Sequence, residues 1–152
     1  MIELLEHRSE VLARRIHEVF QLSYQVEADL VGSSDFPPLQ RSMSHIQSSK
    51  SQFLGEWIGD DLVSVVEFSC TEDTLSIDSL VVHPEYFRRG LGSRIFETLL
   101  NREHWQHADV ETAAANGPAL DLYGKFGFIE AERWLTADGI EKVRLLKTLI
   151  LA

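Results

Sequence analysis

The spacing of apolar residues divides the chain into a helical beginning and a strand-rich remainder. From Ser9 to about Ala28, apolar side chains recur at helical spacing, which predicts an amphipathic helix with Ser9 as its N-cap. Residues 2–6 are expected to form a short edge strand before it. The stretch that follows is rich in Ser, Gln and Pro. Because its two adjacent prolines break regular structure, we expect a loop there, with a short helix restarting over residues 39–46.

After residue 51, β-branched and aromatic residues form short runs that are separated by turn residues. The segments Gly59-Asp60-Asp61 and Asp138-Gly139 are typical of hairpin turns. We expect strands over residues 52–58, 62–69, 75–82, 108–114, 128–135 and 140–149, and helices over residues 89–101 and 118–126. This order predicts an α+β (mixed α/β) fold in which helices cover a single sheet.

The 152 residues, 44% of them apolar and 25% charged, are expected to form a single domain over residues 1–152. No apolar run approaches the roughly 20 residues that cross a bilayer, and the acidic first residues lack the pattern of a signal peptide, so we expect no membrane contact. Cys70 is the single cysteine, which fits a reducing compartment, and we expect a cytoplasmic protein. The net charge of −10 argues against a nucleic-acid partner.

The segment from Leu80 to Ser93 joins an expected strand to an expected helix and carries two glycines. Gly90 and Gly92 allow the backbone to approach a ligand closely. The free N–H groups at the start of the helix would face that ligand, and the positive end of the helix dipole favours an anion such as a pyrophosphate. Neighbouring arginines at positions 88 and 89 add positive charge. Taken alone, the pattern also fits a plain turn.

Two segments together resemble the GNAT superfamily of acetyl-CoA-dependent N-acetyltransferases. Residues 75–93 are similar to its acetyl-CoA-binding motif, with Gly90 and Gly92 at the glycine positions and Phe87 where the family has Gln or Arg. The second signature of the family is matched at Asn116, Ala119, Tyr123, Gly127 and Phe128. The resemblance covers roughly residues 51–149. It implies a single central, mostly antiparallel twisted sheet of about six to seven strands flanked by helices.

By this resemblance, acetyl-CoA is the cosubstrate. The backbone of Leu80 and Val82 would bind the acetyl carbonyl and the pantetheine arm, and Asn116 would contact that arm. Tyr123 would face the sulfur; because its reference pKa of about 10 keeps it protonated, it can act as general acid toward the departing thiolate. The residues expected to bind acetyl-CoA are Leu80, Val81, Val82, Arg88, Arg89, Gly90, Leu91, Gly92, Ser93, Asn116 and Tyr123.

The acceptor amine must lose a proton before it attacks, because a lysine-like amine has a pKa of about 10.4. Asp78 is one candidate for the base, since strand alternation places it on the face of Leu80 unless a bulge intervenes. Glu111 is the other candidate, and resemblance supports it, because ribosomal-protein-alanine N-acetyltransferases carry a catalytic glutamate at that offset from the second signature. Either residue fits a surface carboxylate equally well. Glu67 and His83 are weaker candidates.

The leading hypothesis is an N-acetyltransferase, monomeric or homodimeric, in which a primary amine attacks directly in a ternary complex. The acidic excess predicts a cationic small molecule or a peptide N-terminus as acceptor, with Asp60, Asp61 and Glu67 helping to attract it. A non-catalytic acyl-CoA-binding or sensing module is the alternative, and the charge of −10 disfavours an aminoacyl-tRNA acceptor. His104 and His107 are interpreted as solvated residues, so no metal is expected.

Overall fold

The computed structural model describes residues 1–33 and 35–149, which form one sheet of seven strands in the order β1-β2-β3-β4-β5-β7-β6. Within these ranges β4 and β5 are the one parallel pair, and the other neighbouring strands are antiparallel. The strands are β1 (Ile2–Leu4), β2 (Gln52–Ile58), β3 (Asp61–Thr71), β4 (Thr74–Val82), β5 (His107–Ala113), β6 (Ile129–Leu135) and β7 (Glu141–Thr148). The predicted α+β fold with a mostly antiparallel sheet is confirmed.

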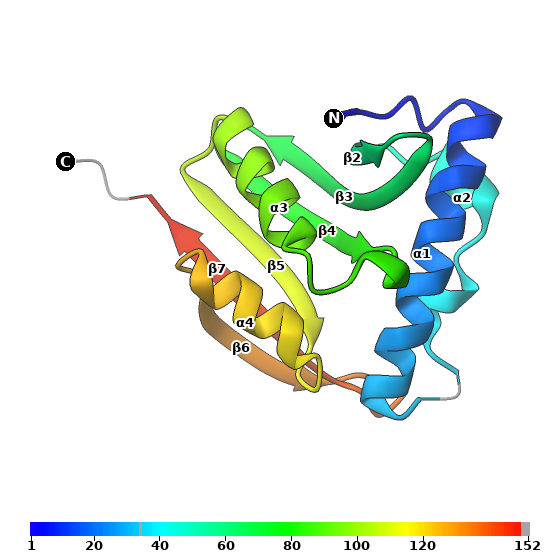
Figure 1. The fold of residues 1–152 in the computed structure, drawn as a ribbon. Coiled ribbons are helices and arrows are strands. Elements are labelled where there is room, and N and C mark those ends of the chain that lie inside the picture. Colours follow the sequence, from blue (N-terminus) through cyan, green and yellow to red (C-terminus); the bar gives the residue numbers. More distant parts are fainter. Residues whose placement is uncertain (34, 150–152) are drawn as a thin grey trace.

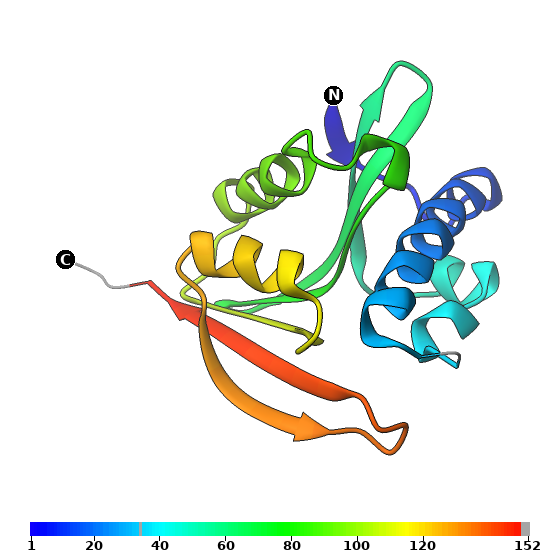
Figure 2. The same ribbon diagram turned by 60° about the horizontal axis from the view of Figure 1, so that its bottom comes forward.

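Helices cover both faces of this sheet. Two of them, α3 and α4, lie on one face, and α1 and α2 lie on the other (Figure 1, Figure 2). The helices are α1 (Glu10–Val31), α2 (Met43–Gln47), α3 (Leu91–Arg102) and α4 (Gly117–Lys125), with the 3-10 turns η1 (Pro37–Gln40) and η2 (Pro84–Tyr86). Each face has its own core, built around Phe96 and Tyr123 on one side and around Ile16 and Phe20 on the other. In the described ranges, no helix is long and apolar enough to cross a membrane.

The long helix α1 begins where the apolar pattern predicts. Ser9 is its N-cap, as predicted, although the serine side chain forms no capping hydrogen bond. The Ser9 backbone carbonyl accepts the first bond instead, from the Ala13 N–H at 2.8 Å. At the other end, Gly32 adopts the left-handed conformation (φ 69°) that commonly terminates a helix.

The helix expected over residues 39–46 forms as two short pieces, η1 and α2. Pro37 lies in the first turn of η1, where a proline has no helical N–H bond to lose. Arg41 and Ser42 are extended, and the Ser42 hydroxyl accepts a hydrogen bond from the His45 N–H, which caps α2. This break lets the Arg41 side chain turn toward β3.

A β-bulge in β4 decides which of its residues share a face. Ile77 and Ser79 pair with two consecutive residues of β3, which leaves Asp78 between them without a ladder partner. The extra residue shifts the alternation of side chains by one position. Leu80 therefore packs toward the core under α3 and α4, whereas Asp78 faces the charges on the opposite side of the sheet. Because this bulge intervenes, Asp78 and Leu80 do not lie on the same face of the sheet, as strict alternation would have predicted.

The bulge also marks the place where two parallel strands separate. The ladder between β4 and β5 runs only from Thr74 to Ile77 on β4, and from His107 to Val110 on β5. Figure 1 shows the two strands diverging toward their ends. The last residues of β4 keep their pairing with β3, so only their β5-facing N–H and C=O groups lack a strand partner in the described sheet. We call this opening, between residues 78–82 and 111–113, the splay.

A buried ion pair joins the segment between η1 and α2 to the sheet. The guanidinium of Arg41 makes two hydrogen bonds to the Glu67 carboxylate, at 2.5 and 2.9 Å, and Ser51 donates a third at 2.6 Å. Burial acts to raise the pKa of Glu67, but the hydrogen bonds from Arg41 and Ser51 outweigh it and hold that pKa below its ordinary value. Glu67 is therefore an ionised structural carboxylate whose oxygens are already occupied.

We expect Arg41→Ala to lower the free energy of unfolding by about 3–5 kcal/mol, because it leaves the buried Glu67 charge without its partner. The matched control is Arg14→Ala, which breaks an ion pair with Glu10 whose side chains are 61% and 65% exposed. That change should cost less than about 0.5 kcal/mol. Urea denaturation measures both. Equal and small effects would show that the Arg41–Glu67 pair does not hold this segment in place.

Candidate active site

A groove of about 590 Å³ opens beside the splay, between the start of α3, the helix α4, the end of β4 and the second half of α1. We call it the α1–α4 groove. Its lining includes Glu27, Leu80, Val82, Phe87, Arg88, Gly90, Leu91, Gly92, Ser93, Asn116, Leu122 and Tyr123. Most residues that the sequence singled out thus meet at one site. Val81 instead packs in the core under α1, and the Arg89 guanidinium lies 5.0 Å from the centre of the Tyr86 ring.

One end of this groove is built for an anion. Gly90 is the N-cap of α3 in the left-handed conformation (φ 74°), which a glycine adopts without steric cost. The Arg94 N–H bonds back to the Gly90 carbonyl at 3.0 Å, so the N–H groups of the three residues between them have no acceptor within the helix. These groups and the positive end of the helix dipole lie where the groove begins, as a phosphate group requires.

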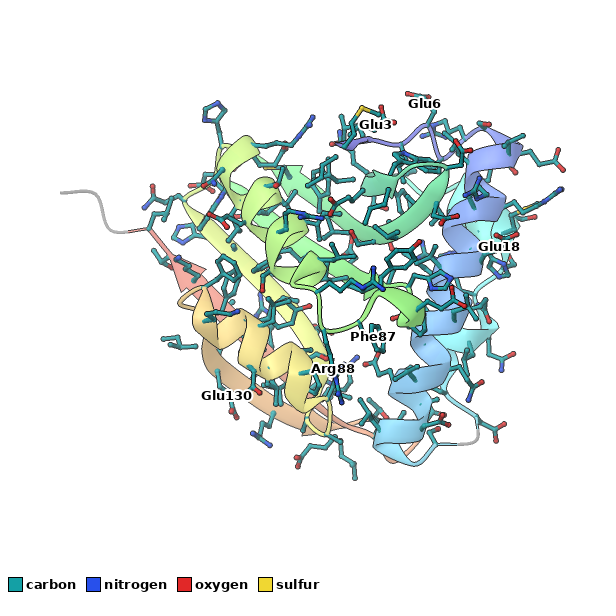
Figure 3. All side chains as sticks on the ribbon, in the orientation of Figure 1. Glu3, Glu6, Glu18, Phe87, Arg88 and Glu130 are labelled. Atoms are coloured by element: carbon teal, nitrogen blue, oxygen red, sulfur yellow. The ribbon has the colours of Figure 1, made fainter. Side chains whose placement is uncertain are left out.

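Of the two arginines before α3, the structure brings only Arg88 to the groove lining. Its backbone is left-handed (φ 66°), a conformation uncommon for a residue other than glycine. Phe87, which replaces the Gln or Arg of the family motif, also lines the groove and is 41% exposed. Figure 3 shows both side chains between α1 and α4. Arg88 therefore supplies a positive charge that the neighbouring phenylalanine cannot.

The other end of the groove holds Tyr123, which α4 presents toward the splay. Its ring is 4% exposed and packs 5.3 Å from the ring of Phe96. Burial raises the pKa of Tyr123 well above its ordinary value, and the nearby Glu27 carboxylate and Tyr24 add to the effect. The hydroxyl is thus held in its protonated form. Asn116 is the N-cap of α4, where its side chain accepts a hydrogen bond from the Ala119 N–H at 3.3 Å.

Glu27 is a site residue that the sequence analysis missed. It lies on the second half of α1, lines the groove, and acts electrostatically on Tyr123. Burial raises the pKa of Glu27, while the Asn116 amide and the positive charge of Lys142 each offset part of that rise. A sequence signal was present: Glu27 follows Tyr24 by one helical turn, so it lies on the inward side of α1 among apolar residues.

Across the splay, on the face of α1 and α2, carboxylates gather around Asp78. Desolvation and the neighbouring Glu67 carboxylate raise the pKa of Asp78 to about 6, although the positive charge of Arg41 opposes them. Glu111 of β5 contributes to the same rise, so the structure brings both candidate bases together. The Tyr24 hydroxyl, whose pKa burial raises to about 12, shares a 2.9 Å hydrogen bond with Ser79 beside them.

Other residues that the sequence proposed lie elsewhere. His83 accepts a hydrogen bond from the Glu85 N–H in the turn η2. Asp60 and Asp61 lie at the turn between β2 and β3, where the Tyr86 hydroxyl donates to Asp61 at 2.8 Å. In the described part of the chain, no three Asp, Glu, His or Cys side chains form a metal-binding group.

A second cavity, of about 690 Å³, lies between the η1–α2 segment and the hairpin of β6 and β7. We call it the hairpin cavity. Its walls are formed by Phe36, Pro37, Pro38, Gln40, Arg41, Ser42, His45, Thr136, Asp138, Ile140 and Lys142. Figure 2 shows the tip of this hairpin extending below α1 and α2. Because Arg41 lines the cavity and its charge acts on Asp78 and Tyr24, the hairpin cavity and the splay carboxylates lie on the same face.

Comparison with known sequences identifies the family. Residues 8–149 match the family model described as an acetyltransferase (GNAT) domain. The chain is also 34% identical, over 141 residues, to the UPF0157 protein YqkA of Bacillus subtilis. That match covers 92% of this chain and 41% of YqkA, so the chain spans about two-fifths of the length of this relative.

Solved structures share the fold at low sequence identity. The ribosomal-protein-S18-alanine N-acetyltransferase of Escherichia coli matches with a TM-score of 0.72 and 18% identity, over 100% of this chain and 95% of that one. The structure of yncA from Salmonella typhimurium, solved with its cofactor acetyl-CoA, matches with a TM-score of 0.74 and 13% identity, over 99% and 94% of the two chains. The resemblance drawn from the glycine loop and the Asn116–Tyr123 segment is confirmed: this chain belongs to the GNAT family of acetyltransferases.

Proposed function

We propose that this chain transfers the acetyl group of acetyl-CoA to a primary amine by direct attack in a ternary complex. One observation carries the proposal: the groove with the anion-binding loop and Tyr123 is lined by β4 where β4 and β5 separate, and Asp78, which follows the last paired residue of β4, faces the opposite side of the sheet. An acyl donor and an acceptor can therefore approach each other from opposite faces of the sheet.

Two features of the groove support acetyl-CoA as its ligand. The N–H groups at the start of α3 and the Arg88 side chain would hold the phosphates. Beyond Ile77, β4 has no strand partner toward β5, so the backbone groups of Leu80 and Val82 on that side are available to the amides of the pantetheine arm. Acetyl-CoA supplies a thioester, whose carbonyl carbon accepts a nucleophile and whose thiol leaves readily.

Two residues would move the protons. Asp78 accepts a proton from the acceptor ammonium, which frees the nitrogen lone pair to bond to the carbonyl carbon. Tyr123 donates its hydroxyl proton to the sulfur as the carbon–sulfur bond breaks. The raised pKa of each residue favours its proposed role. A pKa of about 6 makes Asp78 a stronger base than an ordinary carboxylate, and burial keeps Tyr123 protonated, so that it has a proton to donate.

Gly92→Glu should abolish the rise in melting temperature that acetyl-CoA gives the wild-type chain, because a carboxylate would enter the phosphate site. Gly92→Ala is the control, since a Cβ at this position would meet Val82 at 3.6 Å and Leu122 at 3.8 Å, which are ordinary contacts. In the wild type, acetyl-CoA at 100 times its Kd should add about 2.7 kcal/mol of stability. An undiminished shift in Gly92→Glu would exclude the α3 loop as the phosphate site.

Tyr123→Phe keeps the ring and removes the proton. We expect turnover to fall by roughly 10²-fold while the affinity for acetyl-CoA changes little, as steady-state kinetics and calorimetry can measure. Turnover like that of the wild type would remove Tyr123 as the acid. A wild-type chain that binds acetyl-CoA but acetylates no amine in a broad panel would favour the non-catalytic acyl-CoA-binding module.

Asp78→Asn tests the base through the pH dependence of kcat/KM. In the wild type, kcat/KM should rise as the pH passes about 6 and then level off, because deprotonated Asp78 is the active form. The variant should be slower, and its rate should keep rising toward the pKa of the amine. The same profile for Glu111→Gln decides between the two carboxylates. If the inflection persists in Asp78→Asn and disappears in Glu111→Gln, Glu111 is the base.

A further inference from the structure

We propose that the acceptor is an apolar α-amino acid, whose carboxylate binds Lys142 while its amino group reaches the splay. This inference rests on the proposed acetyl transfer and names its substrate class. It departs from the cationic acceptor that the overall charge suggests.

The position of Lys142 is the first observation. In the ladder of β5 and β7, Lys142 pairs with Ala113, the last residue of β5, so it lies at the open end of the splay. The next residue, Val143, packs in the core under α3 and α4, and alternation therefore turns Lys142 to the opposite face. There the half-buried Lys142 side chain lines the hairpin cavity.

Lys142 is available to a ligand. Among the ion pairs of the described residues, Arg41 is joined to Glu67, whereas Lys142 has no carboxylate within 4.0 Å. A half-buried ammonium without a close partner is a suitable binder for an external carboxylate. His45 offers a second hydrogen-bond donor. Its Nδ1 accepts a hydrogen bond from the Arg41 Nε at 2.9 Å, so in a neutral ring the proton is on Nε2, and that nitrogen can donate to a ligand.

Within the described part of the chain, the hairpin cavity holds one cation that no carboxylate neutralises at close range. Arg41 is paired with Glu67, and His45 accepts from Arg41, so Lys142 and a single acid, Asp138, are the other charged groups among the lining residues. The acidic excess lies largely elsewhere: Glu3, Glu6, Glu18 and Glu130 are exposed at the periphery (Figure 3). An ammonium without a close carboxylate in the wall of a cavity attracts an anionic group.

The spacing between the two ligand charges is short. Lys142 pairs with Ala113 of β5, the strand that forms one edge of the splay, and its charge is felt at Glu27, which lines the α1–α4 groove together with Tyr123. The binder of the carboxylate therefore lies at the margin of the opening through which the amino group would reach the thioester. An acceptor whose amino group meets the thioester there while its carboxylate reaches Lys142 has both groups close together, as an α-amino acid does.

The remaining walls are apolar. Phe36, Pro37 and Pro38 form one side of the hairpin cavity, and Ile140 lies across from them on the hairpin. These residues offer no charge to a polar side chain, whereas an aliphatic or aromatic side chain would bury apolar surface against them. The cavity therefore selects both a carboxylate and an apolar group on the same small molecule.

Matched acceptors test the proposal on the wild-type chain. Phenylalanine, leucine and methionine are each compared with their amides, which keep the amine and the side chain but lack the carboxylate, and with spermidine. After correction for the fraction of neutral amine, kcat/KM for at least one amino acid should exceed that for its amide by about 10- to 100-fold. Lys142→Gln should remove this preference by slowing the amino acid and not the amide.

Lys50→Gln is the control, because Lys50 is exposed, lines neither cavity and loses the same charge. The comparison of acid with amide on the wild type needs no variant, so it decides the matter even if Lys142→Gln fails to fold. Amides or spermidine acetylated as well as the amino acids would overturn the proposal and leave acetyl transfer intact. If acetyl-CoA stabilises the chain and no amine at all is acetylated, the proposed acetyl transfer itself fails, and this inference fails with it.

Discussion

The whole site depends on one unpaired residue in the middle of β4. Asp78 has no partner in the ladder with β3, and the pairing between β4 and β5 stops at the residue before it. Two consequences follow from this bulge. Backbone groups of β4 become available to an extended ligand, and side chains before and after the bulge exchange faces. The groove lined by Leu80 and Val82 lies on one side of this opening and Asp78 faces the other side, which is the arrangement that the proposed reaction between two bound substrates needs.

Burial then assigns different roles to the polar groups at this opening. Arg41 holds Glu67 ionised through close hydrogen bonds, so Glu67 is a fixed negative charge. Desolvation, together with that charge, raises the pKa of the neighbouring Asp78 to about 6. Burial keeps Tyr123 protonated. In the proposed reaction, the base Asp78 and the acid Tyr123 would therefore have well-separated pKa values, and the ion pair that holds the η1–α2 segment also influences the pKa of Asp78.

Local patterns in the sequence predicted the elements well, because they depend on neighbouring residues. Alternating and helical spacing located every strand and the helices α1, α3 and α4 to within a few residues, and the Gly90–Gly92 loop and Tyr123 do line one groove. The misses have a common cause. The bulge at Asp78, the Arg41–Glu67 pair that divides the expected helix over residues 39–46, and the approach of Glu27 to Tyr123 all depend on contacts between distant segments. The spacing of apolar residues within one segment carries no information about such contacts.

A crystal structure of the chain with bound CoA would locate the thiol relative to the splay and so decide whether the acetyl group lies at this opening. We expect the pantetheine arm to hydrogen-bond to the free edge of β4 at Leu80 and Val82, and the sulfur to lie within about 3.5 Å of the Tyr123 hydroxyl. The strands β4 and β5 should remain apart beyond Ile77. A CoA molecule whose phosphates bind the α3 loop but whose thiol points away from the splay into solvent would show that the acetyl group is not transferred at this opening.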